Sequence, residues 1–280
     1  MRLEFTKMEG LGNDYIYIDA ARFHIEDPSS LAVRLSDRHF GIGSDGLVLI
    51  GRSDKADVSM RMFNADGSEG QMCGNAARCI GKYVYERGLI SKTTLKLETP
   101  AGVNTLYLHL DPDGLVGSVS VDMGHARVLQ RDLAVEACGQ SFRGSVVDVG
   151  NPHFVILCDD AEAVDLERIG PAIEHNPLFP DRINVEFVSV VMPGSLSSHV
   201  MPDTIGHLRM RVWERGSGIT LACGTGASAS AAAMVTAGIV SSPCKILMDG
   251  GTLTLHYNAD GTLLMEGPAR IVFEGVVKYQ

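Results

Sequence analysis

The chain has 280 residues, of which 45% are hydrophobic and 21% are charged, with a formal net charge of −10 and a pI of about 5.3. This balance is typical of a globular protein with enough residues for two domains. No cluster of basic residues stands out, so the composition disfavours binding to nucleic acid or to an anionic membrane, although it permits a local anion site.

Two segments bear on the cellular compartment. The first ten residues have no apolar run of the signal-peptide type, so we expect no secretory signal. The stretch from Leu221 to Val240 carries no charge, but it consists mainly of small residues, which favours a buried helix over a membrane span. The six cysteines lack regular spacing and indicate free thiols in the cytoplasm.

The first half is expected to hold short strands and two helices. After an alternating segment at residues 3–8, Gly12-Asn13 precedes a β-prone run at Tyr15–Ile18. Helical spacing predicts a helix over Pro28–Arg38. Further strands are predicted at Leu47–Ile50, Val58–Phe63, Leu95–Glu98, Val103–Leu110 and Val116–Met123.

The second predicted helix follows a polar, glycine-bearing loop and begins near Cys73-Gly74-Asn75. Asn75 suits the N-cap position, small and apolar residues recur at helical spacing as far as Val84, and Arg87-Gly88 suits the helix end. The Cys73 thiol would then lie just before a helix N-terminus. There the macrodipole and free backbone N–H groups favour the thiolate.

The second half, which begins near Gly124, repeats this order. Gly150-Asn151 leads into a strand, and a polar loop later runs into Cys223-Gly224-Thr225 and an alanine-rich helix that continues to Gly238. An ordinary helix is predicted over Asp165–Glu174. Strands are predicted at Val146–Val149, Phe154–Leu157, Asn184–Val191, Leu208–Trp213, Ile246–Met248, Thr252–Tyr257, Thr262–Met265 and Ile271–Val277.

The repeat predicts the fold. Many strands with one principal small-residue helix per half favour an α+β protein of two pseudo-symmetric domains. In each domain a curled sheet would surround a central helix. The abundance of alanine in both helices fits this arrangement, because an enclosed helix must be slim on all sides. The period is too long for a solenoid, so we interpret the repeat as a duplication.

An isolated cysteine is most often a small buried hydrophobe. Four of the six cysteines fit that interpretation: Cys79, Cys138, Cys158 and Cys244. Cys73 and Cys223 differ, because each precedes a helix, each is followed by glycine, and the two hold equivalent places in the repeat. We therefore expect this pair to be functional.

Three chemistries could use two such thiols. Thiol–disulfide exchange usually employs Cys-X-X-Cys, which is absent here, and two distant thiols are too few for a zinc site. Stereoinversion at an acidic carbon fits better, because one thiolate removes a proton from one face and the other thiol delivers one to the opposite face. A substrate carboxylate held at the two helix starts would meet N–H donors that also stabilise the enediolate-like charge.

Several polar residues are ambiguous when taken singly. Asparagines are often turn residues, which applies to Asn13, Asn64, Asn151 and Asn184. Glu214-Arg215 could be a surface ion pair or part of a site. His153 could be a buried, hydrogen-bonded histidine or a functional one.

Taken together, the motifs resemble the diaminopimelate epimerases. These pyridoxal-independent enzymes interconvert LL- and meso-diaminopimelate on the route to lysine and peptidoglycan. The resemblance runs almost end to end and is carried by Lys7–Asp14, Phe63–Ser68, Cys73-Gly74-Asn75, Gly150–His153, Asn184, Glu214–Gly216 and Ala222–Gly226.

The resemblance implies a role for each matched residue. Cys73 and Cys223 would be the catalytic thiols, and His153 and Glu214 would also take part in catalysis. The substrate would be bound by Asn13, Asn64, Gly74, Asn75, Asn151, Asn184, Glu214, Arg215, Gly224 and Thr225.

The resemblance also carries expectations for the whole chain. It implies mostly antiparallel sheets, no metal, no organic cofactor and a homodimer. The last strand, at about residues 266–280, would return to a first domain of residues 1–123. Residues 124–265 would form the second domain.

Three departures from the family pattern are visible. Gly46 stands where members often have Gln, which would remove one substrate contact. Phe273 replaces a Tyr that is associated with dimerisation in some members, and the loop Met192–His207 looks longer than usual. The alternatives are a related cofactor-independent racemase of another amino acid, such as histidine or proline, and a redox or binding protein that uses the thiols as a switch.

Overall fold

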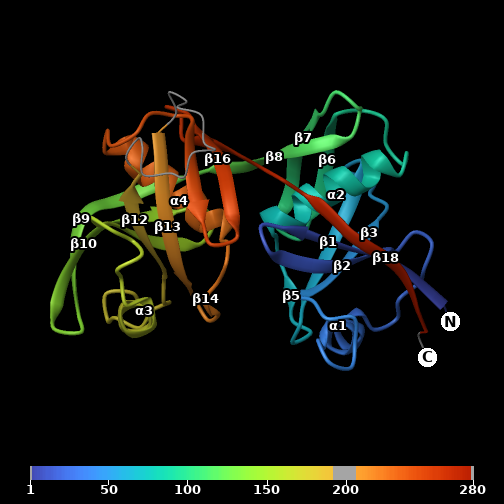
Figure 1. Cartoon of the computed structure of the whole chain (residues 1–280), viewed down its shortest axis with the longest axis horizontal. Coiled ribbons are helices and arrows are strands. Elements are labelled where there is room, and N and C mark those ends of the chain that lie inside the picture. Colours follow the sequence, from blue (N-terminus) through green and yellow to red (C-terminus); the bar gives the residue numbers. More distant parts are fainter. Residues whose placement is uncertain (1, 192–205, 279–280) are drawn as a thin grey trace. The chain divides into compact units, whose positions relative to one another are not determined.

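A computed structural model describes residues 2–191 and 206–278 of the chain (Figure 1). The chain divides into two compact units. The first comprises Met1–Asp122 and Glu266–Gln280, and the second comprises Met123–Met265. The sequence had suggested a boundary one residue later, after position 123. Most of the loop that looked long, Met192–His207, lies outside the described residues.

The first unit contains one twisted sheet and two helices. Its strands are β1 Arg2–Gly10, β2 Asn13–Asp19, β3 Gly46–Gly51, β4 Val58–Asn64, β5 Glu69–Gly70, β6 Thr94–Thr99, β7 Gly102–Leu110, β8 Val116–His125 and β18 Arg270–Lys278. β1 pairs with both β18 and β2. β2–β3 and β4–β6 are parallel, and the other pairs of this unit are antiparallel.

The second unit repeats this plan. Its strands are β9 Arg127–Ala137, β10 Gln140–Asp148, β11 Pro152–Leu157, β12 Asn184–Val190, β13 Gly206–Glu214, β14 Gly218–Ile219, β15 Cys244–Met248, β16 Gly251–Tyr257 and β17 Thr262–Gly267. β10 pairs with both β9 and β11. The parallel steps recur at β11–β12 and β13–β15, and the remaining pairs described for this unit are antiparallel.

The strand registers of the two units correspond residue by residue. In the first unit Gly46 pairs with Tyr15 and with Asn64. In the second unit Asn184 pairs with His153, and the ladder from Val185↔Trp213 continues so that Asn184 stands opposite Glu214. The predicted α+β fold of two pseudo-symmetric, mostly antiparallel units is therefore confirmed.

Each unit has one central helix and one outer helix. The central helices are α2 Gly74–Glu86 and α4 Gly224–Thr236, and the outer helices are α1 Pro28–Ser36 and α3 Leu166–Glu174. Every residue of α4 from Gly226 to Met234 is buried. Alanine and serine fill the positions between these two residues, because a helix with strands on several sides has little room for large side chains.

The outer helices complete the two cores. Leu31 and Leu35 of α1 pack with strand residues such as Ile16 in one cluster of buried apolar side chains. Ile169 and Ile173 of α3 pack in a corresponding cluster of the second unit. Each sheet is thereby anchored by an amphipathic helix, and this rigid frame fixes the strand ends that carry the polar residues.

Two expectations need correction. β9 lies in a region where no strand was predicted, and most of its residues are exposed, so alternation is weak there. Cys138 was interpreted as a buried hydrophobe but is exposed, with φ 53° in the turn that joins β9 to β10.

Candidate active site

Cys73 stands at the start of α2. It is the N-cap residue, with extended backbone angles of φ −139° and ψ 118°, and its carbonyl accepts the Ala77 N–H at 2.9 Å. The prediction that Asn75 caps this helix is wrong, because Asn75 lies inside the first turn. The first N–H groups of a helix have no partner within it, so the thiol lies beside backbone donors.

The side chain of Asn13 connects Cys73 to the rest of its unit. The Cys73 Sγ lies 3.6 Å from Asn13 Oδ1, and the same oxygen accepts from Asn75 Nδ2 at 3.3 Å. Asn75 is in turn held by buried Arg78, whose Nη2 donates to Asn75 Oδ1 at 2.7 Å. An amide oxygen only accepts, so the Cys73 sulfur is on the donor side of this contact.

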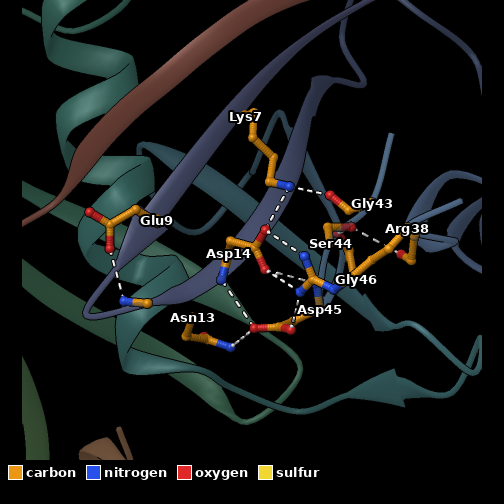
Figure 2. A network of polar contacts seen from close by, with 11 residues as sticks. Lys7, Glu9, Asn13, Asp14, Arg38, Gly43, Ser44, Asp45 and Gly46 are labelled. Atoms are coloured by element: carbon orange, nitrogen blue, oxygen red, sulfur yellow. Dashed lines mark hydrogen bonds and ion pairs between the residues drawn. The ribbon is translucent and has the colours of Figure 1, made fainter. Parts of the chain in front are cut away.

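The other end of Asn13 is fixed by a charged network (Figure 2). Asn13 Nδ2 donates to Asp45 Oδ2 at 2.8 Å, and Arg38 bridges Asp45 and Asp14 at 3.0 Å each. Buried Lys7 pairs with Asp14 at 2.6 Å. Partial burial raises the pKa of Asp14, but the hydrogen bonds and charges of Lys7 and Arg38 outweigh it and hold the pKa below its ordinary value.

Cys223 holds the equivalent position at the start of α4. It has extended angles of φ −126° and ψ 108°, and its carbonyl accepts the Ala227 N–H at 2.9 Å. Its sulfur accepts the Gly226 N–H at 3.4 Å and lies 3.6 Å from Thr225 Oγ1. The Cys223 sulfur therefore accepts from a backbone N–H group, whereas Cys73 faces an acceptor.

The electrostatic surroundings of Cys223 favour its protonated form. Burial raises the pKa of the thiol well above its ordinary value, and the carboxyl groups of Glu214 and Glu186 raise it further. The hydrogen bonds from Thr225 and Gly226 act in the opposite direction but do not outweigh burial. The helix start alone does not make Cys223 a thiolate.

His153 is the centre of the polar cluster in the second unit. Its Nδ1 lies 2.6 Å from Glu186 Oε1, and its Nε2 lies 3.0 Å from Asn151 Oδ1. Asn151 Nδ2 donates to Thr225 Oγ1 at 3.4 Å. The second unit thus brings together four of the residues expected in the site, namely Cys223, Thr225, Asn151 and His153.

The remaining expected residues surround these clusters at strand ends. Asn184 is buried and bonded at both ends of its amide, because its Nδ2 donates to the Pro152 carbonyl at 2.8 Å and its Oδ1 accepts the Arg215 N–H at 2.9 Å. Glu214 accepts from the Thr220 hydroxyl at 2.6 Å. The side chain of Arg215 is exposed, and its Nη1 donates to the Asp181 carbonyl at 3.2 Å.

Asn64 and Gly46 occupy the matching strand ends of the first unit. Asn64 Nδ2 donates to Ser68 Oγ at 2.9 Å across the turn that follows β4. By register Gly46 corresponds to Asn184, yet a Cβ at Gly46 would lie 2.1 Å from the Phe63 carbonyl oxygen. The backbones of β3 and β4 approach so closely there that this place accepts only glycine without a shift.

Some residues of these clusters escaped the sequence analysis. Lys7, Asp14 and Asp45 lie in or beside motifs already singled out, but their ionic pairing depends on β1, β2 and the loop before β3 meeting in space. Glu186 carried a usable signal. It is an acidic residue two places after Asn184 with Val185 and Phe187 on either side, in a buried strand where a charge is costly unless it is paired.

Two features are absent from the described residues. Among them, no group of three or more His, Cys, Asp or Glu side chains is placed to hold a metal ion. In the same part of the chain, no helix is long and apolar enough to cross a membrane.

The duplicated thiol-bearing unit also appears in comparisons with known proteins. The family model described as diaminopimelate epimerase matches residues 5–129 and again residues 145–272. The chain belongs to the diaminopimelate epimerase family. As a member of this family it is an isomerase.

Individual relatives agree with this membership. The diaminopimelate epimerase of Parabacteroides distasonis is 50% identical over 277 residues, covering 99% of this chain and 98% of the relative. That of Bacteroides thetaiotaomicron is 51% identical over 276 residues, covering 98% and 97%. That of Methanococcus maripaludis is 44% identical over 288 residues, covering 98% and 99%.

Solved structures of low sequence identity share the fold. A phenazine biosynthesis protein of the PhzF family from Bacillus anthracis has a TM-score of 0.73 at 16% identity, with 100% of both chains covered. A hydroxyproline epimerase from Agrobacterium vitis has a TM-score of 0.65 at 17% identity, covering 99% of this chain and 91% of that one. These likenesses concern the fold alone.

Proposed function

We propose that this member of the diaminopimelate epimerase family converts LL-diaminopimelate to meso-diaminopimelate, with Cys73 and Cys223 as the two acid/base groups. One observation carries the proposal, namely that each duplicated unit places a cysteine at the N-cap of its central helix. The names and the high identity of the relatives support the choice of substrate.

The proposed chemistry is a balanced proton exchange. One cysteine, as thiolate, takes the α-proton. The electron pair of the broken Cα–H bond is delocalised into the neighbouring carboxylate. The other cysteine, as thiol, gives its proton to the opposite face of the same carbon. The substrate is inverted, and the two thiols have exchanged protonation states, which solvent then resets.

The helix starts would supply the electrostatic stabilisation. We propose that the N–H groups near Gly74, Asn75, Gly224 and Thr225 bind the α-carboxylate and the negative charge that grows on it. Gly226 is a poorer candidate, because its N–H already donates to the Cys223 sulfur.

The outer residues would recognise the distal end of the substrate. Arg215 is exposed and can bind a carboxylate with its two-pronged guanidinium, and Glu214 can accept from an ammonium group. Asn13, Asn64 and Asn151 offer amide groups. Asn184 would act by holding the Arg215 backbone, since its own side chain is engaged.

The proposal extends to the cellular role. The reaction would supply precursors of lysine and peptidoglycan in the cytoplasm, with the enzyme as a homodimer. His153 would assist catalysis by holding Asn151 beside the second thiol. The two thiols suffice for the proton exchange, so the proposal includes no cofactor.

The substrate assignment can be tested by isotope uptake. The protein is incubated in deuterated water with LL-diaminopimelate, histidine or proline, and the α-protons are followed by NMR. We expect loss of the α-proton signal with diaminopimelate alone. Exchange with histidine or proline but not with diaminopimelate would contradict the assignment. Absence of all exchange, together with a reversible Cys73–Cys223 disulfide, would instead favour a redox switch.

A further inference from the structure

Glu186 is a buried carboxyl group to which neither the fold nor the proposed proton exchange assigns a role. It lies in β12 with 0% of its side chain exposed, and its Oε2 makes no hydrogen bond with any described residue. The equivalent position of the first unit is Val48, because Val48 pairs with Met62 as Glu186 pairs with Val212. A half-satisfied buried carboxyl costs stability where an apolar side chain would pack, so packing does not explain this residue.

The hydrogen bonds define how Glu186 acts on His153. Asn151 Oδ1 can only accept, so the His153 Nε2 that faces it at 3.0 Å carries a hydrogen. One further proton then lies between His153 Nδ1 and Glu186 Oε1, which are 2.6 Å apart. Whether that proton belongs to the imidazole or to the carboxyl group, the pair has no net charge and keeps Nε2 as a donor.

The carboxyl group also lies close to the second thiol. A Cβ built on Gly226 would be 2.8 Å from Glu186 Oε1, so this oxygen borders the first turn of α4, where the Gly226 N–H meets the Cys223 sulfur. The ionisable groups that act on Cys223 are Glu214 from β13 and Glu186 from β12, and Glu186 itself faces His153 from β11. Burial raises the pKa of Glu186 as well, although His153 opposes this.

We propose that Glu186 is a positioning residue for Cys223, which holds His153 as an Nε2 donor and keeps the Cys223 proton in place until substrate binds. His153 in turn fixes the Asn151 amide, whose NH₂ group is directed at Thr225, and the Thr225 hydroxyl contacts the sulfur. The significance of this arrangement for catalysis rests on the proposed function. The arrangement itself can be tested without any substrate.

The test is the pH dependence of Cys223 alkylation by iodoacetamide, followed by peptide mass spectrometry in the full-length protein. In the wild type the midpoint should lie above that of free cysteine, about pH 8.5. Glu186→Gln keeps the size of the side chain and can donate to Nδ1, but it removes the acidic oxygen that borders the first turn of α4. It should move the Cys223 midpoint down by about one pH unit. The Cys73 midpoint in the same samples should not move.

Control variants separate charge from packing. Glu162→Gln removes an exposed carboxylate from the same unit and should leave the Cys223 midpoint unchanged. Glu186→Val imitates Val48 of the first unit and should lower the midpoint while also releasing Asn151, so that KM rises along with the fall in kcat.

Three results would overturn the proposal. They are a wild-type midpoint at or below that of free cysteine, an unchanged midpoint in folded Glu186→Gln, and an equal shift in Glu162→Gln. Since alkylation needs no substrate, a shift without diaminopimelate turnover would refute the proposed function and leave the role of Glu186 intact.

Discussion

Asn13 and Asn151 occupy the same place in the two units, yet their amide groups are turned in opposite senses. Asn13 directs its oxygen at Cys73, and its NH₂ group is held by Asp45 in a partly exposed ionic network (Figure 2). Asn151 directs its NH₂ group at Thr225, and its oxygen is held by His153 in a buried pair with Glu186.

The two units thus share the same arrangement of strands and central helix, but the surroundings of their thiols differ. One sulfur faces a hydrogen-bond acceptor, and the other accepts from a backbone N–H group in a buried, acidic environment. A reaction that requires one protonated and one deprotonated thiol at any moment benefits from two groups with unequal surroundings. The following predictions test that inequality.

Removal of either thiol should have the largest effect. Cys73→Ala and Cys223→Ala should each lower the rate of epimerisation by at least about 10³-fold, because each removes one acid/base. Cys138→Ala, at an exposed turn, is the matched control and should retain full activity. Turnover of either site variant near the wild-type rate, measured by conversion of LL-diaminopimelate, would refute the two-thiol mechanism.

A side chain at Gly46 should destabilise the first unit. Gly46→Asn imitates Asn184 of the second unit, but its Cβ would meet the Phe63 carbonyl at 2.1 Å. We expect a loss of about 3 kcal/mol in the free energy of unfolding, measured by urea denaturation. Ala65→Asn, exposed on the following turn, should change stability little. If the free energy of unfolding of Gly46→Asn equals that of the wild type, β3 and β4 can separate at this position, and the prediction is wrong.

The Lys7–Asp14 pair should make the first unit sensitive to acid. Asp14→Asn leaves the buried Lys7 ammonium without its carboxylate and should cost about 2 kcal/mol at pH 7. Because the folded-state pKa of Asp14 is lowered, its contribution is present above its unfolded pKa of about 3.9 and is lost as the pH falls through the folded value.

Urea midpoints measured from pH 7 to pH 3 would check this sign. The difference in urea midpoint between wild type and Asp14→Asn should be constant at neutral pH and shrink below about pH 4. Asp132→Asn, which breaks an exposed pair with Arg143, should have a much smaller effect, because solvent screens that pair. A gap that grows as the pH falls would contradict the assignment.

Loss of the Asp45 charge should have the smallest effect on turnover. Asp45→Asn retains an acceptor for Asn13 but weakens the bond that orients its amide, so we expect kcat to fall about tenfold. Asp113→Asn, in an exposed turn, is the control. Because Glu186 rather than Asp45 governs the second thiol, the alkylation profile of Cys223 should not change. A shift there would contradict the separate roles of the two networks.

The fold could be predicted from local patterns wherever one face of an element is buried. The helix of Pro28–Ser36 and most strands were recognisable because their apolar residues recur with a clear period. β9 was missed because Leu129 and its neighbours are exposed, and pairing with β10 alone defines that strand. The two-residue strands β5 and β14 likewise exist only through pairing with β4 and β13.

The sequence predicts which single residues belong to the candidate site. It does not predict which of them contact one another. Repetition of the helix-start cysteine singled out Cys73 and Cys223. Asparagine suits a capping position, which is why the local pattern predicts that role for Asn75, whereas its amide joins Arg78 in the same helix to Asn13, which is distant in sequence. The ionic networks behind both asparagines depend on strand register, which a local pattern does not define.

The most direct test of the central claim is the isotope pattern of the first turnovers. LL-diaminopimelate is mixed with enzyme in deuterated water, and substrate and product are separated before equilibrium and analysed by mass spectrometry. Two acid/bases on opposite faces predict deuterium at the inverted carbon of the meso product, while unreacted substrate keeps its protium. Early deuterium in the recovered substrate at the level of the product, or product that retains protium, would show that one group serves both faces and would contradict this account.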